Sequence, residues 1–142
     1  LNHIWNIVRA KQKRRLLIVD EAWQLMKYDD SASFLFSLAK RARKYYLGLT
    51  TITQDVEDFV SSKMGRAIVM NSSMQLLLKQ SSAAVDVLSD VFKLTNAERQ
   101  LLSSLPVGQG LFFAGQSHVH IQIVASETET ELITTNPVRY NR

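Results

Sequence analysis

The sequence contains no cysteine, only five glycines and two prolines, and no run of apolar residues long enough to cross a bilayer. Without thiols it forms neither a disulfide nor a thiolate metal site. No stretch of about 18 apolar residues and no signal-peptide pattern is present, so we expect no hydrophobic membrane helix. The 142 residues are 46% hydrophobic and 21% charged, with a net charge of +4. This composition predicts one modestly basic globular domain over residues 1–142.

Two adjacent carboxylates follow a short apolar run. Leu16–Val19 reads Leu-Leu-Ile-Val and precedes Asp20 and Glu21, which predicts a strand buried on both faces. In a parallel α/β sheet, ligands bind where strands end. In P-loop ATPases an acid at this place holds Mg²⁺ and a neighbouring glutamate orients the attacking water. The alternative is structural: Asp20 caps the next helix and Glu21 lies in its first turn.

A second strand ends in an amide. Residues 47–54 favour β structure and finish at Gln54. A neutral amide at this edge can accept a hydrogen bond from water and donate one to a terminal phosphate oxygen. A strand-end glutamine that points into solvent is the alternative. Because two successive strands deliver these residue types at one edge, the pair favours nucleotide chemistry.

The remaining pattern alternates helices with strands and ends in a hairpin. We predict helices over Asn2–Lys11 and Ser31–Tyr46, with Asp29 or Asp30 as cap and Gly48 as the stop signal. Further on we expect a helix at Lys63–Met70, a buried strand at Met74–Lys79, helices at Ala83–Phe92 and Ala97–Leu102, strands at Gly108–Gly115 and Val119–Ala125, and a capped helix from Ser126 that stops at Pro137.

Four ordered segments resemble a known family. LLIVDEAW, RARKYYLGLTTITQD, MNSSMQLLLKQ and PVGQGLFFAGQSHVHIQIVASETE are similar to the C-terminal ATPase domain of VirB4-type conjugation and type IV secretion ATPases. These belong with the HerA and FtsK motors. The resemblance covers about residues 16–137. It implies an α/β, partial RecA-like P-loop NTPase fold, with a mostly parallel sheet flanked by helices and a C-terminal β-hairpin.

The resemblance also implies roles for individual residues. Asp20 and Glu21 correspond to the Walker B pair, with Asp20 bound to Mg²⁺ through water, and Gln54 to the polar sensor. Arg41, Arg43 or Lys44 corresponds to the basic motif that supplies an arginine finger. These cations precede their strand, so a finger from here acts in trans on a neighbouring subunit; a solvated helix face is the alternative. We interpret Trp23 as helix packing beside the site.

One element of an ATPase is absent. None of the glycines, Gly48, Gly65, Gly108, Gly110 and Gly115, is followed by lysine, so the G-x-x-x-x-G-K-[ST] loop is missing. We therefore expect these residues to form the back half of the domain and to be inactive alone. In the full-length protein the resemblance implies ATP and Mg²⁺ as cofactors, a hexameric ring, contact with other secretion components and DNA, and a cytoplasmic position at the inner membrane. A HerA- or FtsK-like DNA translocase and a non-catalytic scaffold are the alternatives.

Overall fold

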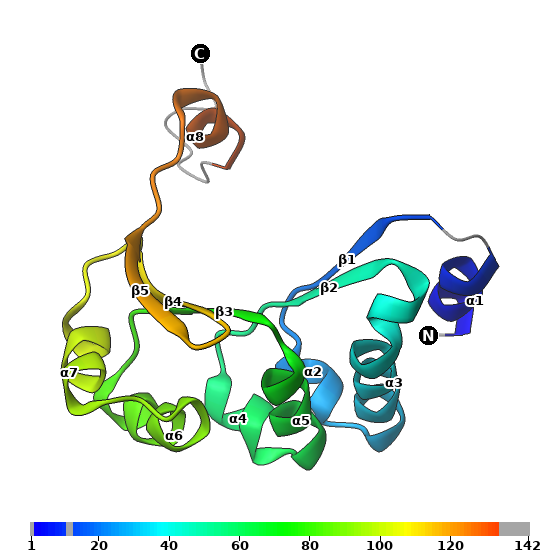
Figure 1. Ribbon diagram of the computed structural model, residues 1–142, viewed down its shortest axis with the longest axis horizontal. Coiled ribbons are helices and arrows are strands. Elements are labelled where there is room, and N and C mark those ends of the chain that lie inside the picture. The colour runs from blue at the N-terminus through cyan, green and yellow to red at the C-terminus, as the bar shows by residue number, and fades with distance from the viewer. Residues whose placement is uncertain (1, 11–12, 134–142) are drawn as a thin grey trace.

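The computed structural model describes residues 2–10 and 13–133, which form helices and short strands in alternation (Figure 1). The predicted alternation of helices and strands is present, although several boundaries shift. The elements are α1 (Asn2–Ala10), β1 (Arg15–Val19), α2 (Trp23–Met26), α3 (Asp29–Arg41), the 3₁₀ helix η1 (Ala42–Tyr45), β2 (Leu47–Thr51), α4 (Val56–Ser61), α5 (Lys63–Asn71), β3 (Met74–Leu78), α6 (Ser82–Phe92), α7 (Asn96–Ser104), β4 (Gln109–Ala114), β5 (Ser117–Gln122) and α8 (Glu127–Ile133).

The strands pair in two groups. β1 and β2 run parallel, with Leu17 opposite Leu49, and the long connection through α3 is the usual crossover of a parallel pair. β3, β4 and β5 form an antiparallel sheet in that order. The predicted α/β class and C-terminal hairpin are confirmed, and among the described strands parallel pairing is limited to β1 and β2.

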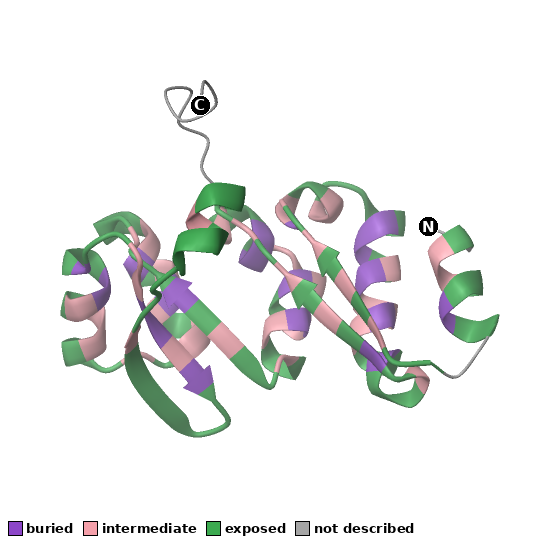
Figure 2. Cartoon of the chain, turned by 90° about the horizontal axis from the view of Figure 1, so that it is seen from above, coloured by how far each residue is buried: buried purple, intermediate pink, exposed green. Residues whose placement is uncertain are grey.

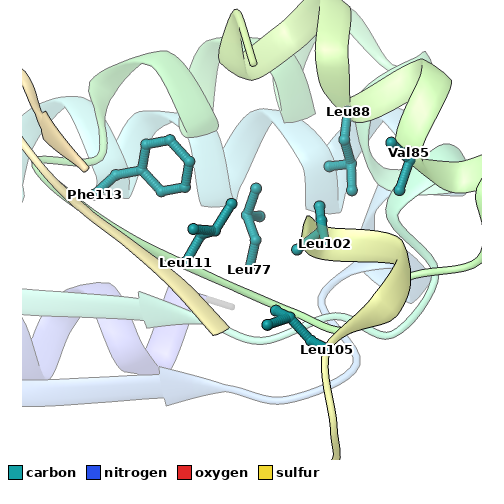
Figure 3. Close-up of a cluster of buried hydrophobic side chains, with 7 residues drawn as sticks. All are labelled: Leu77, Val85, Leu88, Leu102, Leu105, Leu111 and Phe113. Carbon is teal, nitrogen blue, oxygen red and sulfur yellow. The ribbon is translucent and has the colours of Figure 1, made fainter. Parts of the chain in front are cut away.

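The core lies between the strands and the helices on one side of them. Helices α2 to α7 all lie on this side, as Figure 1 shows. Figure 2 shows buried residues along the helix faces that meet the strands. One cluster, under the antiparallel sheet, is drawn in Figure 3 and contains Leu77, Val85, Leu88, Leu102, Leu105, Leu111 and Phe113. Each such leucine contributes about 1.5–3 kcal/mol by burial, which fixes α6 and α7 against β3 and β4.

The prediction that the Leu16–Val19 strand is buried on both faces is wrong for the described chain. Leu17 and Val19 face the helices, whereas Leu16 is 79% exposed and Ile18 is 63% exposed. A strand's side chains alternate between faces, and among the described residues helices pack against one face only. An unbroken apolar run in sequence therefore does not report which of its residues are covered.

The long helix after β1 ends differently from the prediction. α3 begins at Asp29 and passes into η1, and Tyr46 ends it in the left-handed conformation with φ 53°. The expected stop signal, Gly48, instead lies inside β2 opposite Leu16. Tyr46, the last residue of the predicted helix, is 56% exposed. A left-handed tyrosine is uncommon, so residue type gave no sign of this boundary.

A helix that the sequence pattern did not predict, α4, positions the segment after Gln54. Asp55 caps it, because its Oδ1 accepts a hydrogen bond from the Asp58 N–H at 3.0 Å. α5 follows at once and crosses α4 so closely that a Cβ on Gly65 would lie 1.8 Å from the Phe59 carbonyl oxygen. Only glycine fits this crossing.

The C-terminal part is organised by two capping boxes and a tight turn. Thr95 and Glu98 cap α7, and Ser126 and Glu129 cap the start of α8 as the sequence predicts. A two-residue turn at Gly115 and Gln116 joins β4 to β5, whereas the predicted strands left residues 116–118 between them. The predicted stop at Pro137 and the end of the first helix at Lys11 lie outside the described residues.

Candidate functional site

The carboxyl ends of β1 and β2 are locked together beyond the strands themselves. The Ile52 N–H donates to the Val19 carbonyl at 2.8 Å, and the Ala22 N–H donates back to the Ile52 carbonyl at 2.9 Å. Ala22 is fully buried. Backbone hydrogen bonds therefore fix the two segments that carry Glu21 and Gln54, whatever their side chains do.

Glu21 lies at the centre of the side-chain contacts at this edge. Its Oε1 accepts a hydrogen bond from Gln54 Nε2 at 2.8 Å, and its Oε2 accepts one from Trp23 Nε1 at 2.6 Å. Its backbone has φ 50°, the left-handed conformation that costs a non-glycine residue about 1–2 kcal/mol. The structure thus holds one carboxylate by both oxygens on a strained turn, and strain of this kind concentrates at functional positions.

Asp20 is exposed beside Glu21 and does not cap a helix. Its Oδ1 accepts a hydrogen bond from the Glu21 N–H at 2.9 Å. The next helix, α2, has Ala22 at its N-cap and no side-chain cap hydrogen bond. The alternative interpretation, in which Asp20 caps that helix, is therefore wrong. An exposed carboxylate at a strand end remains available to a cation.

A cavity of about 330 Å³ opens next to these residues. Trp23 and Gln54, the two partners of Glu21, line it from one part of the chain, and Gln80 and Ser81 line it from the loop after β3. Ser81 caps α6 by accepting a hydrogen bond from the Ala84 N–H at 3.3 Å. The loop after β3 thus lies at the same edge as Gln54.

The basic residues lie at the other end of the parallel pair. Arg41 ends α3, and Arg43 and Lys44 belong to η1, before β2 begins, whereas Gln54 follows β2 (Figure 1). A strand of five residues spans about 17 Å, so the structure does not bring these cations to Glu21. The guanidinium of Arg41 lies 6.0 Å from the ring centre of Trp5. Arg43 is exposed, and its side chain makes no hydrogen bond or ion pair with the described residues.

Sequence reasoning assigned Trp23 to packing alone. The ring does pack against the cluster that contains Ala22, Leu35 and Phe59. Its N–H, however, also reaches Glu21, a contact that no spacing rule reveals because the left-handed turn at Glu21 creates it. Among the described residues no cluster of three or more metal-ligating side chains is found, and no helix is long and apolar enough to cross a membrane.

Comparisons with known proteins agree on one group. The model of the TraG P-loop domain family matches residues 2–128. Protein TraC of Escherichia coli (strain K12) is 34% identical over 74 residues, which are 49% of this chain and 8% of TraC. The structure of VirB4 of Thermoanaerobacter pseudethanolicus matches with a TM-score of 0.82 and 35% identity, over 90% of this chain and 36% of that one.

The chain thus spans only part of each relative. The family match nevertheless covers both strands that carry Asp20, Glu21 and Gln54, and it continues through the hairpin. It also covers Arg41 and Arg43 at the opposite end of the parallel pair. This chain belongs to the TraG P-loop domain family.

Proposed function

We propose that these residues form part of a VirB4-like ATPase, in which ATP hydrolysis drives conjugative transfer or type IV secretion. The observation that carries the proposal is the 2.8 Å hydrogen bond between Gln54 and Glu21 at the ends of two parallel strands. That edge is where nucleotide sites form in parallel α/β folds. The similarity to VirB4 and TraC supports the choice of ATPase.

Asp20 fits a role in binding Mg²⁺. It is a hard oxygen ligand, it is exposed, and one of its two oxygens is occupied by the Glu21 N–H. Mg²⁺ keeps several waters and binds proteins through one or two carboxylates together with substrate phosphates. A single aspartate at this edge is therefore a suitable protein contribution. When bound, Mg²⁺ would neutralise charge on the phosphates.

Glu21 and Gln54 fit the handling of the attacking water. Glu21 is held by two donors, so its carboxylate has one orientation and can accept a proton or a hydrogen bond at a defined point. The Gln54 amide has donor and acceptor capacity beyond its bond to Glu21. It can exchange that bond for one to a terminal phosphate oxygen, which makes it the proposed sensor.

The basic residues fit a role between subunits. Arg43 and Arg41 lie at the opposite end of β2 from Gln54, so neither reaches its own subunit's site. In a hexameric ring such a guanidinium would serve the neighbouring site as an arginine finger. The proposal further includes other secretion components and DNA as partners, and a cytoplasmic position at the inner membrane.

The test begins with the complete reading frame that encodes these residues. We expect it to contain a G-x-x-x-x-G-K-[ST] loop upstream, and the purified protein to hydrolyse ATP. Glu21→Gln should keep ATP binding and lower turnover by on the order of 10²-fold or more, the scale of a lost general base. Asp20→Asn should weaken Mg²⁺-dependent ATP binding instead.

Glu98→Gln is the matched control. Glu98 is another half-buried glutamate with both oxygens engaged, and its partners are Thr95 and His118 rather than residues of the proposed site, so its amide variant should hydrolyse ATP normally. Unchanged turnover in Glu21→Gln would contradict the proposal. A frame without the phosphate loop would favour a non-catalytic scaffold.

A further inference from the structure

Trp23 combines a fixed ring with a directed donor. Its ring is half-buried against the cluster that contains Ala22 and Leu35, and Lys27 Nζ lies over the ring, 4.1 Å from its centre. A tryptophan has only two side-chain torsions, and packing plus a cation over the face restricts both. The indole N–H then has one direction, and in that direction lies Glu21 Oε2, at 2.6 Å.

The two partners of Glu21 differ in how firmly they are held. Gln54 is exposed, and the one side-chain hydrogen bond found for it among the described residues is its bond to Glu21. It can therefore swing away at little cost. Trp23 cannot leave without disturbing the cluster around Ala22. When Gln54 turns toward another acceptor, Trp23 remains as the donor that keeps the Glu21 carboxylate in place.

We propose that Trp23 is the positioning residue of Glu21: its indole N–H fixes the carboxylate in the orientation from which Glu21 accepts the proton of the attacking water. This rests on the proposed ATPase function. It assigns to Trp23 a role beyond packing, and it makes Gln54 the exchangeable partner of Glu21 and Trp23 the permanent one.

The contact itself is testable on this chain by NMR. The chain has two tryptophans, so its spectrum should contain two indole N–H resonances, and Trp5→Phe assigns them. Because a bond to a carboxylate deshields the proton, the Trp23 resonance should move upfield in Glu21→Ala while that of Trp5 stays. A Trp23 resonance that does not respond to Glu21→Ala overturns the inference at its first step.

The catalytic consequence is testable in the complete ATPase. Replacing Trp23 by β-(3-benzothienyl)alanine keeps the ring shape and exchanges only the N–H for sulfur. We expect kcat to fall roughly 10- to 100-fold, the scale of one hydrogen bond to a charged group. The KM for ATP should stay within about twofold, because the lost interaction orients Glu21 rather than binding substrate. Trp23→Phe, which also lacks the N–H donor, should likewise show a lower kcat with a nearly unchanged KM.

Trp5 is the matched control, because it is the other tryptophan and lies beside Tyr45, away from Glu21. The same replacement at Trp5 should leave kcat unchanged. Normal kcat in both Trp23 variants, with Glu21→Gln inactive, would overturn the positioning role and leave the ATPase proposal standing. Normal kcat in Glu21→Gln as well would remove the proposed function itself. A fall in kcat matched by an equal rise in KM would also contradict positioning.

Discussion

The carboxylates of Glu21 and Glu98 are held in nearly the same way, but the two sets of contacts have different consequences. Each is half-buried and has both carboxylate oxygens engaged. Glu98 Oε2 accepts from the Thr95 N–H at 2.7 Å and from its hydroxyl at 2.8 Å, and Oε1 lies 2.6 Å from His118 Nδ1. The hydrogen bonds of Glu98 either cap α7 or connect α7 to β5 through His118, so its contacts stabilise the fold.

The side-chain contacts of Glu21 cap no helix. Its partners are a strand-end amide and an indole, and its backbone stands in the left-handed conformation that an L-residue avoids. The backbone conformation of Glu21 therefore lowers the stability of the fold, whereas the contacts of Glu98 raise it. A carboxylate whose arrangement costs stability is a better candidate for chemistry than one whose arrangement supplies it.

The same contrast separates two arginines. Arg99 forms an ion pair with Asp86 between α7 and α6. Arg43 makes no such pair among the described residues. Arg99 therefore stabilises the packing of α7 on α6, whereas the guanidinium of Arg43 is available to bind a group outside this chain.

The largest effect is expected from Arg43. Arg43→Ala in the complete ATPase should lower turnover by roughly 10³–10⁵-fold while the same subunit still binds ATP, because a finger stabilises charge in the transition state. Mixing this variant with Glu21→Gln should restore some activity, since mixed rings contain interfaces with both residues intact. Turnover of the mixture, measured after subunit exchange, checks the prediction.

Arg99→Ala is the control for Arg43, and it should hydrolyse ATP at the normal rate. Arg41→Ala removes a side chain that already contacts Trp5, and it should have a smaller effect than Arg43→Ala. Mixed rings that assemble but stay inactive would disprove action in trans. Arg41, Arg43 and Lys44 would then be interpreted as a solvated helix face.

The next effect concerns stability. Glu98→Ala should lower the free energy of unfolding by about 1–2 kcal/mol, because it removes the reciprocal half of a capping box and the partner of His118. ATP turnover should be unchanged. Chemical denaturation of both proteins checks the first expectation. A stable Glu98→Ala protein would break the contrast with Glu21.

A glycine–alanine pair at each position measures the backbone directly. At position 21 we expect glycine to be more stable than alanine by about 1 kcal/mol, because only glycine adopts φ 50° freely. At position 98, inside α7, the order should reverse by about 0.5–1 kcal/mol. Unfolding midpoints of the four variants give both differences. The same order at both positions would show that the turn at Glu21 is not strained.

The smallest effect is a pH dependence. Hydrogen bonding from the Thr95 backbone, aided by His118, holds the pKa of Glu98 below its usual value of 4.5. A carboxyl whose folded-state pKa is lowered stabilises the protein above the unfolded pKa, and this is lost as pH falls through the folded one. The stability difference between the wild type and Glu98→Gln should therefore shrink on acidification below 4.5. A constant difference contradicts this.

The sequence predicted the fold class better than it predicted exposure. Apolar runs located β1 and β3, and the capping box at Ser126 located the start of α8, because these features depend on neighbouring residues alone. The exposure of Leu16 and Ile18 depends on what covers the strand, which no local pattern contains.

In the candidate site, too, the features that depend on local sequence were predictable and those that depend on the folded structure were not. The positions of Glu21 and Gln54 at one edge were predictable from strand ends, and their hydrogen bond places them together. Their chemical roles stay predictions. The Trp23 contact was not predictable, because it depends on a left-handed turn that residue type disfavours.

The separation of paired strands along the chain determines the order in which the pairs form during folding. β4 and β5 meet across a two-residue turn, and hairpins of this kind form within about 1–10 μs. Gln54 and Glu21 are 33 residues apart, and their strands pair only after α3 has folded back between them. Closing so long a connection delays the parallel pair. We therefore expect the hairpin to form early in folding and the Glu21 contacts to be among the last to appear.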